Sequence, residues 1–345
     1  MQVSYNPLFP SFQPWQLPQP PEPPRFLAQL ASNQPTSQDT KASGEPSTSS
    51  SGTNDSTSST GSTGTSHQSA AVQAFLLRVQ EMLYQAGGDG DDTLSGWSGS
   101  LIEGNGGNDS IDVWSDSAVD GGAGDDNIRA WSNTVVMGGD GNDTISAWSD
   151  SVVDGGAGDD NIRAWSNSKV SGGAGNDTIS AWSDSTVDGG AGNDTISIWS
   201  GGRADGGEGD DSIWAGVGGH VEGGAGNDTI YAANGTVASG GAGDDTISAD
   251  TGATVRFGAG DGKDTVFASR DVTIAFGEGL SAEDMNITMS GNVATISFGD
   301  GSDQLTVNLG PQPVTLAFAD GSTSEIKFDW RAAATTAPTK LDQSA

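Results

Sequence analysis

Aspartates recur every seventeen residues through the middle of this 345-residue chain, each at the end of a glycine-rich turn. The turn reads Gly-Gly-x-Gly-x-Asp, as in GGAGND at 172–177. Its glycines allow backbone conformations closed to residues with a Cβ, and they can turn carbonyl oxygens toward one point. Carboxylate and carbonyl oxygens are the ligand set that Ca²⁺ prefers. The ten aspartates are Asp92, Asp109, Asp126, Asp143, Asp160, Asp177, Asp194, Asp211, Asp228 and Asp245.

A divalent cation also explains how so many carboxylates can share one line. If successive turns stack like the strands of a sheet, these side chains lie about 5 Å apart. They then repel one another unless a cation lies between them. Zinc is a poor candidate, because the chain has no cysteine and two histidines. We therefore expect calcium, in roughly nine sites between ten turns. The glycines expected to shape these sites are Gly88, Gly90, Gly122, Gly124, Gly139, Gly141, Gly156, Gly158, Gly173, Gly175, Gly190, Gly192, Gly207, Gly209, Gly224, Gly226, Gly241 and Gly243.

Two apolar columns accompany the aspartates. We number each unit from 1 to 17 starting at its first glycine, so that the first unit begins at residue 87 and the tenth ends at 256. Position 8 is Leu94 or an isoleucine in every unit, and position 16 is Ile, Val or Ala. Two short strands joined by two turns form one coil of a parallel solenoid, and stacked coils bury a continuous aliphatic column. The sequence therefore predicts an all-β solenoid of ten seventeen-residue coils.

The phrase GGAGNDTIS resembles the GGxGxDxUx nonapeptide of repeats-in-toxin (RTX), or haemolysin-type calcium-binding, proteins. The resemblance covers residues 87–256 and implies a parallel β-roll whose Gly-Asp turns hold Ca²⁺. It also implies a protein secreted from a Gram-negative bacterium and folded by external calcium. The family usually places a calcium nonapeptide on both edges of an eighteen-residue coil, whereas the second half here has eight residues, AWSDSTVD. Calcium is therefore expected along one edge only.

The second edge carries the pattern Trp-Ser-x-Ser. Its position 13 is Asp, Asn or Gly in every unit, the set that a left-handed turn residue requires. The serines can cap the turn through their hydroxyls. Two interpretations of the tryptophans stay open: indoles folded inward as a stacked filler, or an outward ladder forming a possible binding face for carbohydrate or ice. The tryptophans are Trp97, Trp114, Trp131, Trp148, Trp165, Trp182 and Trp199.

Four further segments flank the array. Residues 1–68 are rich first in Pro and Gln and then in Ser and Thr, which predicts a disordered tail. Residues 69–86 have amphipathic-helix spacing, and we expect this helix to cap the first coil. Strand-like runs separated by Gly-Asp and Asp-Gly pairs predict a β-hairpin cap over 257–330. Residues 331–345 are expected to form a flexible tail.

Composition narrows the function. The net charge of −33 argues against binding to nucleic acid or anionic lipid and favours a cationic partner. Neither a Sec-type signal peptide nor a membrane span is recognisable, so export is expected to use another signal, of type I or type III. We expect no enzymatic activity, because the chain has no HExxH, GxSxG or cysteine nucleophile.

Three functions stay open. The first is a secreted, non-enzymatic calcium-binding protein whose folded rod presents an adhesin-like surface to cells or carbohydrate. The second is a harpin-like type III effector acting on a host, suggested by the composition of the N-terminal region. The third is ice binding, although ice-binding relatives in the family carry Thr in the calcium turn, where this chain mostly has Ala.

Overall fold

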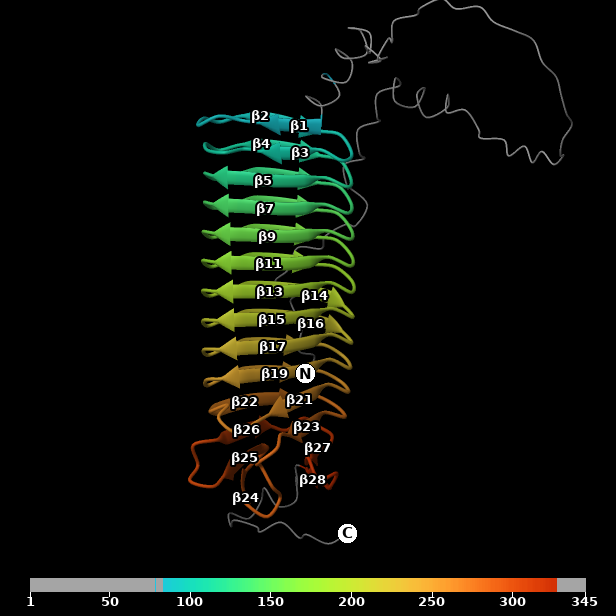
Figure 1. Ribbon diagram of the computed structural model, residues 1–345. Coiled ribbons are helices and arrows are strands. Elements are labelled where there is room, and N and C mark those ends of the chain that lie inside the picture. Colours follow the sequence, from blue (N-terminus) through green and yellow to red (C-terminus); the bar gives the residue numbers. More distant parts are fainter. Residues whose placement is uncertain (1–77, 79–82, 328–345) are drawn as a thin grey trace, which may run out of the picture. The chain divides into compact units, whose positions relative to one another are not determined.

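The computed structural model describes residue 78 and residues 83–327. These residues form two long, mainly parallel sheets that face each other across a narrow core (Figure 1). The predictions for the tails at 1–68 and 331–345 lie outside this range, as does most of the predicted helix at 69–86. Residues 84–86 form a strand, which corrects the predicted C-terminal end of that helix. Within the described residues, no helix is long and apolar enough to cross a membrane.

The first sheet consists of fourteen strands, most of which precede a glycine turn. Its order is β1 (Tyr84–Ala86), β3 (Leu101–Glu103), β5 (Ala118–Ala123), β7 (Val135–Asp140), β9 (Val152–Ala157), β11 (Lys169–Ala174), β13 (Thr186–Ala191), β15 (Arg203–Glu208), β17 (His220–Ala225), β19 (Val237–Ala242), β21 (Thr254–Phe257), β23 (Thr273–Phe276), β27 (Val314–Ala317) and β28 (Thr323–Ile326).

The second sheet also has fourteen strands, most of which follow a glycine turn. Its order is β2 (Thr93–Gly96), β4 (Ser110–Val113), β6 (Asn127–Ala130), β8 (Thr144–Ala147), β10 (Asn161–Ala164), β12 (Thr178–Ala181), β14 (Thr195–Ser200), β16 (Ser212–Val217), β18 (Thr229–Ala232), β20 (Thr246–Ala249), β22 (Lys263–Ala268), β26 (Gln304–Asn308), β25 (Val293–Phe298) and β24 (Met285–Ser290).

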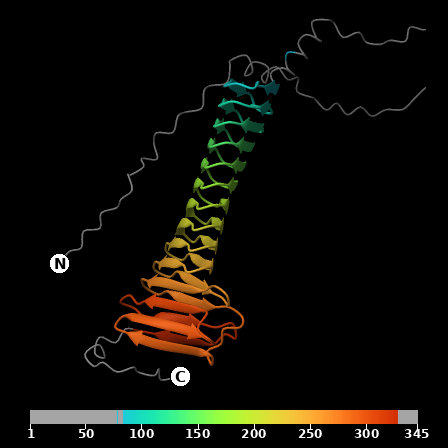
Figure 2. The ribbon, with the colours of Figure 1, turned by 90° about the vertical axis from the view of Figure 1, so that its left-hand side faces the viewer.

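The pairing register equals the sequence period. Ile162 pairs with Ile145 on one side and Ile179 on the other, and each step is seventeen residues. Each residue type therefore forms a straight column along the stack, which is the predicted parallel solenoid. Figure 2 shows the coils stacked one on the next, with wider strands at the C-terminal end.

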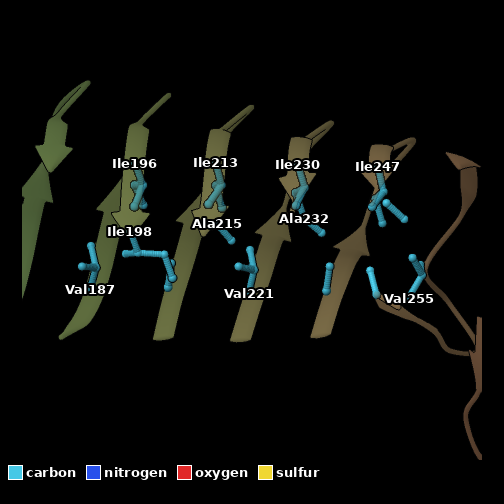
Figure 3. Packing of buried hydrophobic residues seen from close by; sticks show 14 of the residues in the cluster. Val187, Ile196, Ile198, Ile213, Ala215, Val221, Ile230, Ala232, Ile247 and Val255 are labelled. Atoms are coloured by element: carbon cyan, nitrogen blue, oxygen red, sulfur yellow. The ribbon is translucent and has the colours of Figure 1, made fainter. Parts of the chain in front are cut away.

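The core is the pair of predicted apolar columns together with position 10. The isoleucines of position 8 are at most 2 % exposed, and the residues of position 16 are also buried (Figure 3). Position 10, mostly alanine, lies between the sheets as well, as Ala164 and Ala181 show. The small residue at position 10 keeps each coil thin. Leu94 in the first coil is only partly buried.

Beyond the tenth unit the solenoid continues with a changed period. β21 pairs with β23 and β20 with β22, each with an offset of nineteen residues, which adds an eleventh coil. β26 pairs in parallel with β22, and β27 pairs in parallel with β23. β25 and β24 then extend the first of these sheets by antiparallel pairing, and β28 extends the other in the same way. The core there is aromatic, because Phe276 stacks on Phe318 and meets Phe257 and Phe298 edge-on.

Candidate metal-binding edge

The glycine turns adopt a conformation that L side chains rarely reach. Gly156 and Gly158, at positions 2 and 4, have φ values of 110° and 128°. A Cβ on either residue would overlap the carbonyl oxygen of the equivalent glycine in the preceding coil. Glycine is therefore required by both the dihedral angle and the stacking of the turns. Asn105, which replaces glycine at position 2 of the second unit, keeps a left-handed φ of 74°, a conformation that asparagine tolerates.

The aspartates of position 6 form one buried column. One oxygen of each carboxylate, Oδ1, accepts a hydrogen bond from the backbone N–H of the aspartate in the preceding coil. Asp160 donates in this way to Asp177 at 2.8 Å, and Asp177 donates to Asp194 at 2.7 Å. The same bond recurs at 2.7–2.8 Å from Asp92 to Asp245. One oxygen of the carboxylate thus forms a hydrogen bond that links neighbouring coils.

The second oxygen, Oδ2, has no protein partner in nine of these side chains, nor in Asp264, which follows the tenth unit. It is buried and accepts no hydrogen bond in Asp109, Asp126, Asp143, Asp160, Asp177, Asp194, Asp211, Asp228, Asp245 and Asp264. A buried polar atom without a partner is destabilising, and an anionic one especially so. A column of such atoms therefore indicates a partner of positive charge.

The unpartnered oxygens face a space that glycine leaves free. A Cβ on Gly172, at position 1, would overlap both the Oδ2 of Asp177 in its own coil and the carbonyl oxygen of Gly189 in the next. These two oxygens therefore converge beside a residue that has no side chain. The glycines flanked by both kinds of oxygen are Gly87, Gly104, Gly121, Gly138, Gly155, Gly172, Gly189, Gly206 and Gly223. Converging carboxylate and carbonyl oxygens are donors suited to a hard cation such as Ca²⁺.

Burial raises the pKa of several column carboxylates in the absence of a cation. Loss of solvation, reinforced by Asp160 and Asp126, raises the pKa of Asp143 to about 7. In the same way, burial and a neighbouring column carboxylate raise the pKa of Asp211 to about 7 and of Asp160 to about 6. A divalent ion bound beside these carboxylates would oppose the shifts, because a nearby positive charge favours the ionised form.

Position 5, next to the column, has a different task. Each Asp or Asn there accepts, through Oδ1, the backbone N–H of position 5 in the following coil. Asp159 accepts from Asn176 at 2.7 Å, and Asn142 accepts from Asp159 at 2.8 Å. An amide oxygen performs this task as well as a carboxylate oxygen. Position 5 therefore tolerates both residues, whereas position 6 is Asp throughout.

Comparison with known families agrees with this geometry. The profile described as RTX calcium-binding nonapeptide repeat (4 copies) matches residues 86–100, 130–162, 167–196, 183–201, 203–219, 220–236 and 237–254. These turns are RTX calcium-binding nonapeptide repeats. A comparison with curated proteins gives no match. In the described part of the chain, no three His, Cys, Asp or Glu side chains gather as a metal site on their own. A metal ion at these turns would therefore need backbone carbonyls as well as carboxylates.

The structure places all ten predicted aspartates in the RTX column, but the two ends differ from the middle. In the first RTX turn the Oδ2 of Asp92 accepts the N–H of Gly88 at 2.6 Å. At the other end the column contains an eleventh aspartate, Asp264, which the sequence analysis missed. The sequence signal for Asp264 is the segment GAGDGKD at 258–264. This segment is a glycine turn in which two inserted residues interrupt the regular spacing of the aspartates.

The second edge of the RTX coil is a left-handed turn with hydrogen bonds between coils. The predicted left-handed conformation at position 13 is confirmed, because Asp116, Asn133, Asp150, Asn167 and Asp184 have φ values between 60° and 63°. Position 14 is buried and bonds across coils. For example, the hydroxyl of Ser185 donates to the carbonyl of Trp165 at 3.2 Å, while its oxygen accepts the N–H of Ser168 at 3.3 Å. Serine at position 14 thus caps the turn, as predicted.

The seven tryptophans of this edge stack into a ladder outside the apolar core. Neighbouring ring centroids are 4.2–6.2 Å apart, with interplanar angles of 3–24°. Trp97 to Trp182 are half-buried, and Trp199 is 47 % exposed. The row continues through Trp214, which meets Trp199 edge-on, to Tyr231. The indoles therefore cover one another's faces and expose their rims, an arrangement that combines features of both interpretations.

Proposed function

We propose that this protein is a secreted, non-enzymatic RTX protein that folds when external Ca²⁺ fills the glycine-aspartate edge. The observation that carries the proposal is the column of buried Oδ2 atoms without a protein partner. The carbonyls and carboxylates that converge beside the position-1 glycines would hold the ions, in about nine equivalent sites. Bound calcium would supply the positive charge that these carboxylates lack.

The charge of the array explains why folding would depend on calcium. Residues 87–256 contain 29 acidic and 5 basic residues, a net charge of −24. Such a chain is expanded by self-repulsion when free of metal and becomes compact once the cations are bound. Scarce cytosolic calcium would keep it unfolded for export. Abundant calcium outside would start folding.

Calcium titration of the purified full chain tests this proposal. We expect a cooperative transition from coil to β structure in circular dichroism, together with a change in tryptophan fluorescence as the ladder assembles. Magnesium is the control, because it requires small octahedral sites and gives up its water reluctantly. A roll that is already folded with chelator present, or one that responds equally to magnesium, would contradict the calcium switch.

We further propose that the tryptophan edge is the interaction surface, with carbohydrate on cell surfaces as its partner. Supporting this, the ladder exposes indole rims beside the hydroxyls of position 12 and the carboxylates of Asp116, Asp150 and Asp184. Hydroxyl-rich ligands can donate to such carboxylates and pack on aromatic edges. A glycan array with the calcium-loaded protein tests this, and a variant with Trp131, Trp148 and Trp165 changed to Ala is the comparison. Equal glycan binding by the unchanged protein and the triple variant would show that adhesion does not depend on the tryptophan edge.

The export route separates this proposal from the effector alternative. Secretion by type I would follow from a signal in the C-terminal region, whereas a type III effector would depend on residues 1–70. The two corresponding deletions, assayed for appearance of the protein in the medium, distinguish them. Loss of export on the N-terminal deletion alone would favour the harpin-like alternative.

A further inference from the structure

An apolar stripe runs along the outer face of the first sheet, at its N-terminal end. Position 15 points outward there, and its residues pair in register from β1 to β9. The large side chains of this column, together with the neighbouring Met137, are 44–49 % exposed. After β9 the column becomes polar, with Lys169, Thr186 and Arg203. We call the following residues the N-terminal stripe: Tyr84, Leu101, Ala118, Val135, Met137 and Val152.

A second apolar stripe lies on the outer face of the other sheet, toward its C-terminal end. Position 9 also points outward, and in β16, β18 and β22 it is Trp214, Tyr231 and Phe267, with Ser248 of β20 in the same column. Tyr231 and Phe267 are 40 % and 49 % exposed, and Trp214 stacks almost parallel to Tyr231. We call Trp214, Tyr231 and Phe267 the C-terminal stripe. Earlier in the column the residues are polar or charged: Asp112, Arg129, Ser146, Arg163, Ser180 and Ser197.

The two stripes match each other in spacing and in length. Both belong to one solenoid, so their outward residues recur at the same distance between strands, about 4.8 Å. The N-terminal stripe extends over β1, β3, β5, β7 and β9, and the C-terminal stripe over β16, β18, β20 and β22. Sheets with aligned strands pack face to face when their side chains interdigitate. A second copy of this chain therefore offers a partner of matching period and polarity for each stripe.

Other partners fit the N-terminal stripe less well. Leu83 is helical and Tyr84 is the first residue of β1. A helix that folds back onto a sheet usually needs a connection of about two to six residues, and none separates Leu83 from Tyr84. The segment that precedes β1 is therefore poorly placed to cover this stripe. An anionic lipid surface is disfavoured by the net charge of −33.

A parallel, staggered arrangement keeps charged residues out of the contact. The charges of the first sheet, such as Lys169 and Arg203, follow the N-terminal stripe, whereas those of the second sheet, such as Arg129 and Arg163, precede the C-terminal stripe. When two solenoids point in the same direction and their stripes meet, these two charged regions lie at opposite ends of the overlap. They then do not face each other, and apolar residues form the centre of the contact.

We propose that the N-terminal stripe of one copy binds the C-terminal stripe of a second copy, with the two solenoids parallel and staggered. The contact joins two different surfaces, and each copy has both, so association can continue from copy to copy. An overlap of so few strands is small for a stable complex, so the association is weak and depends on concentration. Because each copy carries a charge of −33, salt should strengthen the association by screening repulsion.

Sedimentation velocity of the full chain with calcium, over a wide range of protein concentration, tests this inference. One double variant carries Val135→Thr and Val152→Thr, and the other carries Tyr231→Thr and Phe267→Thr. Threonine removes apolar surface and keeps a high strand propensity, so each variant should fold and associate about tenfold or more weakly. Val217→Thr is the matched control, because Val217 is exposed but lies outside both stripes. It should associate like the unchanged chain.

A mixture of the two double variants distinguishes contact between unlike surfaces from contact between like surfaces. Each variant retains the stripe that the other has lost. The mixture should therefore form pairs with an affinity near that of the unchanged chain, and the pairs should not grow further. A mixture that associates no better than either variant alone would overturn the inference.

Oxidation of Met137 by hydrogen peroxide reports what covers the N-terminal stripe. In the unchanged chain, the rate of oxidation should fall as protein concentration rises, and it should stay constant in the variant of Tyr231 and Phe267. Slow oxidation at every concentration would show that a segment of the same chain covers the stripe. Fast oxidation at every concentration would show that nothing covers it. Either result, or sedimentation independent of concentration, would overturn the inference and leave the proposed calcium function untouched.

Discussion

Each column aspartate uses its two oxygens for different purposes. Oδ1 accepts a backbone N–H from the preceding coil, and Oδ2, which has no protein partner, is the atom that we propose binds a cation. Asparagine can perform the first task but not the second, because its amide nitrogen is a donor. This difference explains why position 5, which uses only Oδ1, is Asp in some coils and Asn in others. At position 6 both oxygens are needed, and only Asp occurs.

The adjacent pair Asp159 and Asp160 allows this division to be tested with equal changes of charge. Asp160→Asn keeps an acceptor for the N–H of Asp143 but removes the Oδ2 that we propose binds a cation. We expect fewer bound calcium ions and a folding midpoint shifted to roughly 3- to 10-fold higher calcium. Asp159→Asn keeps its bond to Asn176 and should leave both values nearly unchanged. If the two variants behave alike in a calcium titration, net charge and not ligation controls folding.

The raised pKa values of the column predict how pH acts on the calcium-free roll. Asp160 and Asp211 titrate near 6 and 7 when folded, above the usual 3.8. Folding without metal is therefore most favourable below about pH 4 and becomes less so as pH rises to about 7, because the unfolded chain ionises more readily. With chelator present, β structure in circular dichroism should increase on acidification. With calcium present, acidification should instead decrease β structure, since protons compete with the ion for the carboxylates. β content independent of pH would contradict this prediction.

At the scale of the turn, position 13 depends on backbone conformation and not on charge. Asp150 has a φ of 63°, and glycine takes the same place in other coils. Asp150→Gly should therefore be nearly neutral. Asp150→Ala should destabilise the calcium-loaded protein by about 1–2 kcal/mol, because alanine is strained in the left-handed region. Chemical denaturation in saturating calcium measures both. Equal losses in the two variants would show that the carboxylate itself stabilises the turn.

The tryptophan ladder should contribute to stability as a unit. Trp165 stacks on Trp148 at 4.8 Å and on Trp182 at 5.0 Å, almost parallel to both. Trp165→Ala should cost about 1–3 kcal/mol from its two aromatic pairs. Trp97→Ala, at the end of the ladder, loses one partner at 6.2 Å and should cost less. Denaturation in saturating calcium compares the two variants, and an equal cost would show that stacking contributes little.

The sequence predicted those elements that depend on period and residue type. Ile162 and Asp160 recur every seventeen residues, so their columns and their burial followed from counting, and Asp or Asn at position 13 indicated a left-handed turn. The orientation of Trp165 depends on how a four-residue turn folds, which alternation alone does not decide. Asp264 was missed because two inserted residues hide its turn. The strand at Tyr84 competes with a helical pattern, and pairing with β3 decides the outcome.

At the scale of the whole array, the near-repeat of two units limits repulsion between stacked charges. Along position 13, Asp and Asn alternate from Asp116 to Asp184, and Asn167 donates its side-chain amide to Asp150 at 3.3 Å. On the adjacent strand of the same sheet, Arg129 similarly lies 3.7 Å from Asp112. Because parallel strands place identical positions about 5 Å apart, a single-unit repeat would place like charges in contact. From Asp116 to Asp184, alternation thus places a neutral Asn beside each Asp of position 13.

Removal of one two-unit block should therefore shorten the solenoid and preserve its structure. Deleting residues 155–188 joins Asp154 to Gly189, a junction already present as Asp188–Gly189, and every column stays in register. The shortened chain should fold with calcium and bind about two fewer ions, since Asp160 and Asp177 are lost. Deleting 155–180 joins mismatched positions and turns apolar residues away from the core. It should fail to show the calcium transition in circular dichroism. If both deletions fold equally well, register between coils does not determine the fold, and the column of aspartates cannot be its organising element.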